Sequence, residues 1–468
     1  MLIKNILLAF QLENYKNARF LKFIYTHFPF WFYGSERQNL VWTKKALFIL
    51  VLTLFLFLGD CMSGIFVILS FGAQKILIIP FILLEIFLLP LYFVIANIIS
   101  YPLDSYLKNK IIQQATKKIS NFKNLIVIGI TGSYGKTSTK DMVYTLLKEK
   151  FKVLTTEGNK NTPLGVSEII LEKLNEDIEI FIVEMGAYIP GDIKTLCDIV
   201  KPKIGILTGI TLQHLERFKS LENIIKTKFE LIESLPIDGF ALIDTSSQGV
   251  KTGLEKYKDF FAIKNIITIS DTIPFHYCDN LEGINFEIEG KSYQTKLIAK
   301  HSLQTIQIAY KLAKYFSIND EIIEELIKNL PYTKHRMELI RNIKTGVNII
   351  DDSYNGNIEG VKSIIDLLKN IKINGRKIII VGGIVELGEK SKEVNEQLGK
   401  DLANCADMIL LSKGKIGEAI YRGLKEKGFD EKNIKIYSHS LDIHNDLGNI
   451  LQFGDLIIFQ NDLPDNYL

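Results

Sequence analysis

The stretch LIVIGITGSYGKTSTKDMVYTLLKEK, residues 125–150, decides the fold of this chain. An apolar run typical of a buried parallel strand leads into a glycine-rich turn (131–139), and a segment with helical periodicity follows (140–150). Phosphate-binding loops have this order, because backbone N–H groups at a helix start hold phosphate oxygens. The spacing is unusual, since the common G-x-x-x-x-G-K-[ST] pattern requires glycine where Ile130 stands. The turn still offers Lys136 to neutralise phosphate and Thr137 to ligate Mg²⁺.

Strand-like and helix-like segments continue to alternate after this turn. The alternation predicts a mostly parallel sheet covered by helices on both faces, and a second α/β unit begins near Pro331. We expect strands at 178–186 and 204–210 in the first unit, and at 347–355, 377–384, 407–413 and 455–460 in the second. The prediction is an α/β fold with a P-loop parallel-sheet ATPase domain (101–330) and a C-terminal Rossmann-like α/β domain (331–468).

The most apolar part of the chain, residues 46–100, precedes the α/β region. About 20 apolar residues span a bilayer core, so we interpret it as a transmembrane helical hairpin with spans at 46–71 and 76–100. Lysines and arginines flank both ends and only Lys75 lies in the turn, which places the catalytic domains on the cytoplasmic face. Residues 1–45 mix basic and aromatic residues and suit a basic amphipathic segment at the membrane surface. The alternative is a buried helical pair in a soluble domain.

Composition limits the partners. The net charge of +3 is too small to indicate nucleic acid binding. The four cysteines are scattered without a C-x-x-C pair, which excludes a zinc ribbon and favours a reducing compartment.

Asp60 and Glu85 lie inside the apolar hairpin, where carboxylates are costly. Either they have a functional role or they pair with polar groups across the hairpin.

The glycine-rich turn, in GITGSYGKTSTKD, resembles the shortened phosphate loop of the Mur ligases, the ATP-dependent amide-forming enzymes of peptidoglycan synthesis. The similarity extends from near residue 124 to the end. Further motifs that carry it are EGNKNTPLGVSEIIL (157–171), VEMGAYIPGDI (183–193), ILTGITLQHLERFKSLENIIKTKFEL (206–231), HRMEL (335–339), IIDDSYNGN (349–357) and ELGE (386–389). Three of these, VEMGAYIPGDI, IIDDSYNGN and ELGE, are similar to those of the member that adds D-alanyl-D-alanine to the muramoyl tripeptide.

The resemblance implies a reaction in which ATP phosphorylates a carboxylate and an amine attacks the acyl phosphate, with ATP and two Mg²⁺ ions as cofactors. By resemblance, the catalytic residues are Lys136, Lys228, His214, Arg336 and Asp352; the nucleotide contacts are Gly132, Ser133, Gly135, Lys136, Thr137, Ser138, Asn159, Asn161 and Asn355; and the metal contacts are Thr137, Glu184, His214 and Lys228. Lys228 matches a lysine that is carbamylated in many Mur ligases. The alternatives are an unmodified surface lysine at 228, a packing role for His214, and an interdomain salt bridge at Arg336.

Two segments depart from the family pattern. HSLQT (301–305) replaces H-N-x-x-N, so that Ser302 and Thr305 stand where asparagines are usual, and FQNDLPDNYL (459–468) replaces a Lys-Gly-Ser-Arg motif. The hairpin also occupies the place of a soluble UDP-sugar-binding domain.

The expected location is therefore the bacterial cytoplasmic membrane, with two spans. The expected partners are the lipid bilayer, a UDP-linked or lipid-linked muropeptide or other carboxylate acceptor, and D-alanyl-D-alanine or another amine. Two other functions stay open. One is a non-catalytic membrane scaffold that binds nucleotide or muropeptide, and the other is a ligase similar to folylpolyglutamate synthase.

Overall fold

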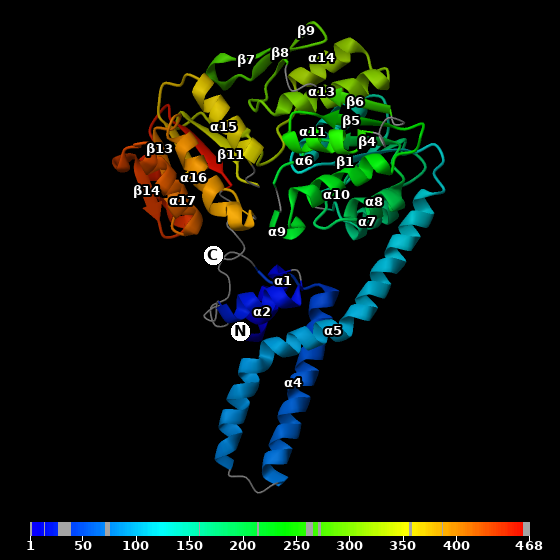
Figure 1. Ribbon diagram of the computed structural model, residues 1–468, viewed down its shortest axis with the longest axis vertical. Helices are drawn as coiled ribbons and strands as arrows, with labels where there is room; N and C mark the ends of the chain where they lie inside the picture. Colours follow the sequence, from blue (N-terminus) through cyan, green and yellow to red (C-terminus); the bar gives the residue numbers. More distant parts are fainter. Residues whose placement is uncertain are drawn as a thin grey trace. The chain divides into compact units, whose positions relative to one another are not determined.

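Figure 1 shows the protein as a computed structural model. The structure describes residues 2–461 except 14, 27–38, 71–74, 159, 213–214, 259–264, 270–272, 355–357 and 386. The chain divides into two compact units, one covering Met1–Lys110 and the other Ile111–Leu463. Each unit is described by itself below.

Long apolar helices build the first unit. Its helices are α1 (Leu2–Leu12), α2 (Asn17–Thr26), α4 (Lys44–Ser70), the 3-10 helix η1 (Lys75–Leu77) and α5 (Ile78–Ile119). By length and composition, α4 and α5 are both sufficient to cross a membrane. The second span was expected to end at residue 100, but α5 continues without interruption to Ile119. Pro90 and Pro102 lie inside α5, where each removes a backbone donor and favours a bend.

The two carboxylates within the hairpin share one tyrosine. The hydroxyl of Tyr92, on α5, hydrogen-bonds to Asp60 on α4 and lies 2.5 Å from Glu85 Oε2. Of the two possibilities left open by the sequence, the structure thus shows a polar partner for both carboxylates. At the other end of the hairpin, α1 buries the side chains of Ile6 and Phe10 in a cluster that includes residues of α4 and α5.

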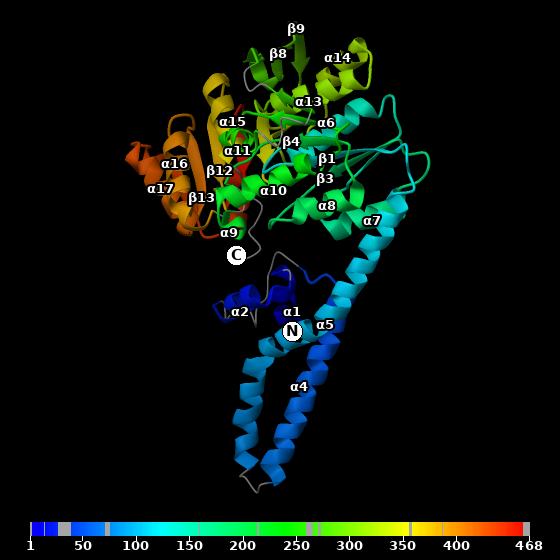
Figure 2. The same cartoon turned by 45° about the vertical axis from the view of Figure 1, so that its right-hand side comes forward.

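A six-stranded parallel sheet forms the first half of the second unit, as expected. Its strand order is β2-β3-β1-β4-β5-β6, and Figure 2 shows helices on both of its faces. The strands are β1 (Ile126–Thr131), β2 (Val153–Thr155), β3 (Ile180–Glu184), β4 (Ile204–Leu207), β5 (Phe240–Asp244) and β6 (Asn265–Ile269). The helices are α6 (Lys136–Leu147), α7 (Pro163–Lys173), α8 (Asp192–Val200), α9 (Leu215–Phe218), α10 (Leu221–Glu233), α11 (Gln248–Lys256), α13 (Ser302–Tyr315) and α14 (Asp320–Lys328).

The side chains of β1 point alternately to the two faces of the sheet, which explains why helices cover both faces. Ile128 and Ile130 pack in a core with α6 and α13, whereas Val127 packs in a second core with α7, α8 and α10. Successive strand residues point to opposite faces, so a fully apolar strand requires helices on both. The turn after β1 is thereby fixed at the carboxyl edge of a rigid sheet.

A second six-stranded sheet follows, in the order β10-β11-β15-β12-β13-β14. Its strands are β10 (Glu338–Asn342), β11 (Val347–Asp352), β12 (Lys377–Val381), β13 (Met408–Ser412), β14 (Ile434–Tyr437) and β15 (Leu456–Gln460). Only β10 pairs antiparallel. The helices of this part are α15 (Ile358–Asn370), η3 (Gly388–Lys390), α16 (Ser391–Leu402), α17 (Lys415–Glu426), η4 (Glu431–Asn433) and α18 (Ser440–Ile450).

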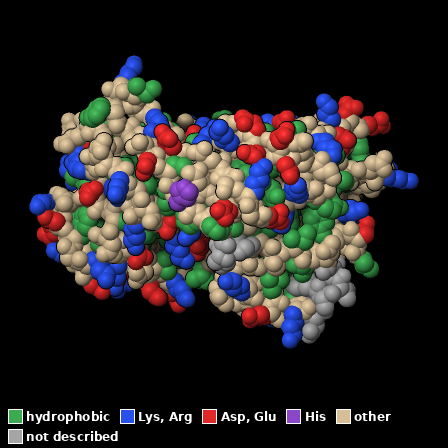
Figure 3. All heavy atoms as spheres, turned by 90° about the horizontal axis from the view of Figure 1, so that it is seen from above, with side chains coloured by type: hydrophobic (Ala, Val, Ile, Leu, Met, Phe, Trp, Pro, Cys, Tyr) green, Lys and Arg blue, Asp and Glu red, His purple; other side chains and the backbone are tan. Residues whose placement is uncertain are grey.

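A small antiparallel sheet was not expected from the sequence. It consists of β7 (Phe275–Tyr277), β8 (Ile284–Ile288) and β9 (Lys291–Thr295), with η2 (Asp279–Leu281) between the first two strands. On the face shown in Figure 3, basic and acidic side chains are interspersed, which is the usual pattern of a solvated surface.

Candidate functional site

The glycine-rich turn joins the end of β1 to the start of α6. Gly135 has a φ of 74° and directly precedes Lys136, the first residue of α6. No side chain caps this helix, so the N–H groups of its first turn are available to an anion. Gly132 lies so close to β4 that a Cβ built on it would be 2.1 Å from Thr208 Oγ1. The predicted anion-binding turn is therefore shaped by two required glycines.

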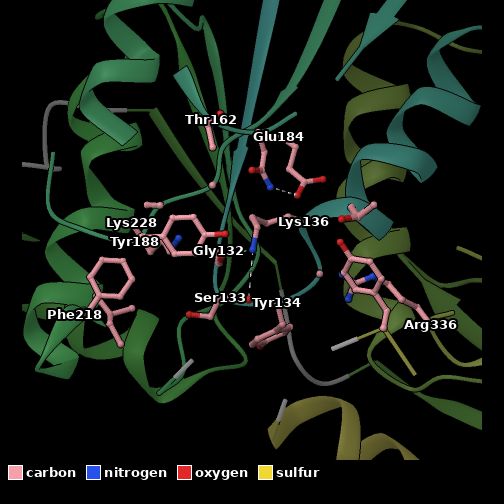
Figure 4. A pocket seen from close by; sticks show the side chains of 17 residues that line it. Gly132, Ser133, Tyr134, Lys136, Thr162, Glu184, Tyr188, Phe218, Lys228 and Arg336 are labelled. Carbon is pink, nitrogen blue, oxygen red and sulfur yellow. Dashed lines mark hydrogen bonds between the residues drawn. The ribbon is translucent and has the colours of Figure 1, made fainter. Parts of the chain in front are cut away.

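Lys136 projects from the first turn of α6 into the cavity drawn in Figure 4. Its Nζ donates to the carbonyl oxygen of Gly132 at 2.8 Å and approaches that of Ser133 at 3.4 Å. Burial lowers the pKa of Lys136 and the charge of Arg336 lowers it further, whereas Glu184 raises it. A bound polyphosphate would supply the negative charge that this buried cation lacks.

Glu184 ends β3, next to the turn. The register of the sheet pairs Glu184 with Ile130, the residue two positions before Gly132. Its Oε1 accepts a hydrogen bond from Asn161 Nδ2 at 3.2 Å, whereas its buried Oε2 has no hydrogen-bond partner among the described residues. A buried carboxylate oxygen and the hydroxyl of Thr137, which lines the same cavity, suit a hard cation such as Mg²⁺, which prefers oxygen ligands. The residues present therefore fit a magnesium ion.

Lys228 lies on α10 and is 4% exposed, so the alternative of a surface lysine is wrong. Burial lowers its pKa to about 7, and the nearby charge of Lys136 contributes, against the effects of Asp192 and Glu230. In Figure 4, Lys228 lies on the opposite side of the cavity from Arg336. A buried amine with this pKa is substantially neutral near pH 7.5 and is a nucleophile.

Arg336 enters the cavity from the turn before β10. Its guanidinium stacks on the ring of Tyr354, with 4.7 Å between Cζ and the ring centroid. Asp352 accepts a hydrogen bond from the backbone N–H of Met337 at 3.1 Å and does not line the cavity, and its predicted catalytic role stays a prediction. Burial raises the pKa of Asp352 to about 7, against the opposing charge of Arg336.

One cavity of about 230 Å³ thus collects most of the predicted residues. They are Gly132, Ser133, Gly135, Lys136, Thr137, Asn161, Glu184, Lys228 and Arg336. Ser138 is next to this group but does not line the cavity. Asn159, His214 and Asn355 lie outside the described residues, so their predicted roles stay predictions.

Sequence reasoning did not assign several other lining residues. Tyr188, Phe218 and Ile224 contribute ring and aliphatic surface, and Thr162 and Gly186 contribute small groups. Some of these residues belong to motifs already recognised, such as VEMGAYIPGDI. Residues that directly follow a strand carrying a predicted site residue could therefore have been predicted to line the cavity.

A second cavity of about 290 Å³ lies on the other side of the turn, and Tyr134 and Gly135 line both cavities. Gln304 and Thr305 of the divergent HSLQT segment line the second one, together with His301. His301 Nδ1 is 2.8 Å from Ser363 Oγ of α15. Burial lowers the pKa of His301 to about 4, so this imidazole is neutral at physiological pH.

Comparison with protein families assigns both halves of the second unit. Residues 130–319 match the Mur ligase middle domain, and residues 335–460 match the domain described as Mur ligase, glutamate ligase domain. Together these matches cover the loop, the cavity and the second six-stranded sheet.

Similar proteins occur in several bacteria. The UDP-N-acetylmuramoyl-tripeptide–D-alanyl-D-alanine ligase of Bacillus subtilis is 27% identical over 351 residues, which are 75% of this chain and 76% of that protein. The ligase of the same name from Borreliella burgdorferi is 30% identical over 281 residues, 58% of each protein. Among solved structures, MurF ligase from Thermotoga maritima in complex with ADP has a TM-score of 0.65 at 27% identity, covering 75% of this chain and 80% of that one.

The fold is also shared with a folate enzyme. The structure of Escherichia coli FolC in complex with DHPP and ADP covers 75% of this chain and 89% of that one, with a TM-score of 0.55 at 12% identity. At this identity the likeness shows a common fold alone.

Proposed function

The chain belongs to the Mur ligase family and is an ATP-dependent ligase, and on this premise we propose that it adds D-alanyl-D-alanine to a muramoyl peptide while attached to a membrane. The carboxylate of the acceptor first takes the γ-phosphoryl group of ATP. The amine then attacks this acyl phosphate and inorganic phosphate leaves. Phosphoryl transfer depends mostly on positioning and charge neutralisation, so the residues around the phosphates matter most.

One observation carries the proposed chemistry. The carboxylate of Glu184, whose buried Oε2 accepts no hydrogen bond from the described residues and lies 3.9 Å from Lys140 Nζ, lines the same cavity as the uncapped start of α6 and Lys136. In this proposal Lys136 binds the terminal phosphates, and Thr137 and Glu184 hold Mg²⁺, which neutralises the phosphate oxygens when bound. Arg336 approaches from the C-terminal half and adds a further positive charge as the two halves close.

Lys228 is proposed to carry a carbamate. Carbon dioxide adds to a neutral amine, and the depressed pKa of Lys228 supplies that form. The product is an anion at a buried position 4% exposed to solvent, where it faces the metal and Lys136. The modification would place a negative charge near the Lys136 cation.

The acceptor is proposed from the names of the relatives, which act on UDP-N-acetylmuramoyl-tripeptide and D-alanyl-D-alanine. A lipid-linked muropeptide is the second form of the same acceptor, because the apolar hairpin would keep the enzyme at the bilayer. Many large apolar side chains of α4 and α5, such as Phe55, Phe66 and Leu83, are more than half exposed. The exposure of these apolar side chains supports the proposed membrane attachment, since lipid would bury them.

Purified full-length protein in detergent or nanodiscs tests the reaction. We expect phosphate release that requires ATP, Mg²⁺, acceptor and D-alanyl-D-alanine, with the amide product identified by mass spectrometry and both signals lost in Lys136→Ala. Lys148→Ala, at the C-terminal end of the same helix, is the matched control. Phosphate release that is absent, or unaffected by Lys136→Ala, would refute the ligase proposal. Parallel assays with UDP-linked and lipid-linked acceptors decide which form is used.

The membrane attachment has a separate test. After cell lysis the full chain is expected to stay in the membrane pellet through alkaline carbonate and to float with liposomes. Release into the carbonate supernatant would contradict it, whatever the result of the activity assay.

A further inference from the structure

The turn that presents Arg336 to the cavity has an unusual backbone. The residues on either side of Arg336 are both left-handed, His335 with a φ of 60° and Met337 with a φ of 47°. Residues other than glycine adopt this region only where the surrounding structure determines it, and such positions cluster at functional sites. Something must therefore hold this turn in place.

Three backbone hydrogen bonds hold part of it. The N–H of His335 donates to Glu338 Oε2 at 3.1 Å, and the N–H of Met337 donates to Asp352 Oδ1 at 3.1 Å. The carbonyl oxygen of His335 accepts from the N–H of Tyr354 at 3.3 Å. Each left-handed residue is thus tied to a neighbour on β10, on β11 or in the loop after β11.

The imidazole of His335 adds a bond to β11. Its Nδ1 lies 2.7 Å from Asp351 Oδ2, and because an ionised carboxylate only accepts, Nδ1 carries the hydrogen. Asp351 Oδ1 accepts from the N–H of Ser353 at 3.1 Å and from its hydroxyl. Burial opposes ionisation of Asp351, but the hydrogen bonds from Ser353 and His335 hold its pKa below the ordinary value.

We propose that His335, oriented by Asp351, is a positioning residue that fixes Arg336 in the cavity for phosphoryl transfer. His335 does not line the cavity itself, so any effect on the reaction passes through the turn to Arg336. The inference rests on the proposed function, since it assigns a role within that reaction. His335, Glu338 and Asp351 also lie within 4.8 Å of one another, as metal ligands do. However, the described bonds commit Nδ1 to Asp351 and Glu338 to the backbone, which favours positioning.

Substitutions at His335 separate the imidazole from the backbone conformation. Glycine adopts the left-handed region freely but removes the bond to Asp351. Asparagine tolerates this region and keeps an N–H donor. We expect His335→Gly to lower kcat by about 10- to 100-fold, the usual loss when a catalytic group is poorly oriented, while KM for the amine changes little. His335→Asn is expected to recover a measurable part of that loss.

A double-mutant comparison tests whether the effect passes through Arg336. In an Arg336→Ala background, His335→Gly should cause no further loss, because the group that it positions is already gone. His276→Gly, on the exposed strand β7, is the control histidine and should leave turnover unchanged. Thermal unfolding of every variant checks the fold, and Asp351→Asn gives a second route if His335→Gly does not fold.

The outcomes distinguish this inference from the proposed function. If the wild-type protein turns over and His335→Gly has the same kcat, the positioning role is overturned and the proposed function is not. An equal loss in the Arg336→Ala background would do the same, since it would show a merely structural effect. Wild-type protein that releases no phosphate with any acceptor would overturn the proposed function and, with it, this inference.

Discussion

Replacing Lys228 tests whether a buried amine becomes an anion in this site. The pKa of Lys228 is lowered to about 7 from the ordinary 10.5 by burial and by Lys136. Near pH 7.5 the neutral fraction of the amine therefore rises from about 0.1% to about 75%, roughly a thousandfold. Only the neutral form adds carbon dioxide, so the lowered pKa of Lys228 supplies the form of the amine that carbamate formation requires.

The assay is amine-dependent phosphate release in buffers depleted of or supplemented with bicarbonate. We expect Lys228→Ala to lower kcat by about 100-fold or more, as loss of one preorganised charged group commonly does. Short-chain carboxylates should restore part of the activity by occupying the vacated space. Wild-type activity should fall as the pH drops below about 7, because protonation of the amine removes the form that reacts with carbon dioxide.

A control on the same helix separates charge from helix effects. Lys226 is exposed on α10, so Lys226→Ala should leave both activity and bicarbonate dependence unchanged. The carbamate is refuted if Lys228→Ala stays active, or if wild-type activity ignores bicarbonate and carboxylates fail to rescue the variant.

Three further changes have defined outcomes. Glu184→Gln should lower kcat by about 100-fold and raise the Mg²⁺ concentration for half-maximal rate, and an unchanged Mg²⁺ titration would contradict its role. Gly209→Ala would put a Cβ 2.4 Å from the ring of Tyr134. This change should reduce the free energy of unfolding, measured by denaturant melts, by about 1–3 kcal/mol. The control Gly448→Ala, at an exposed helical position, should maintain or increase the free energy of unfolding. Arg336→Lys loses the planar stacked group, so kcat should fall about tenfold, and full activity would argue against closure over the phosphates.

The elements predicted correctly from the sequence share one property, a continuous apolar run. The strands β1, β3 and β4, and the parallel strands β12, β13 and β15, are largely buried and carry stretches of Ile, Val and Leu. Strand β11 has a shorter apolar part, and only its Val347 and Ile350 are buried. By contrast, β2 and β7 have only three residues each and β9 is mostly polar, so these strands give a weak signal, whereas the alternation of apolar and polar residues in β8 is a strand signal that was not recognised. The second span was expected to end at residue 100, whereas α5 continues through Pro102 to Ile119, because a helix kinks at proline and continues.

The parts of the candidate site that could be predicted are those whose residues lie within one short motif or at the end of a strand. The turn, Lys136 and Thr137 follow from one motif, and Glu184 from its place at a strand end. The stacking of Arg336 on Tyr354 and the burial of Lys228 depend on packing between segments distant in the chain, which spacing cannot express. The side chain of Asp352, which the family motif also indicates, hydrogen-bonds to the backbone of a turn, and its predicted catalytic role stays a prediction.

The turn after β1 also separates the two cavities and lines both of them. Because Tyr134 and Gly135 line both cavities, a substitution at either position alters two compartments at once, and its kinetic effect has no unique assignment. Lys228 lines only the first cavity and Gln304 only the second. To assign ligand binding to one cavity by mutation, substitutions should therefore be made at residues such as Lys228 and Gln304, which line one cavity each. The loop that lines both cavities should be left unchanged.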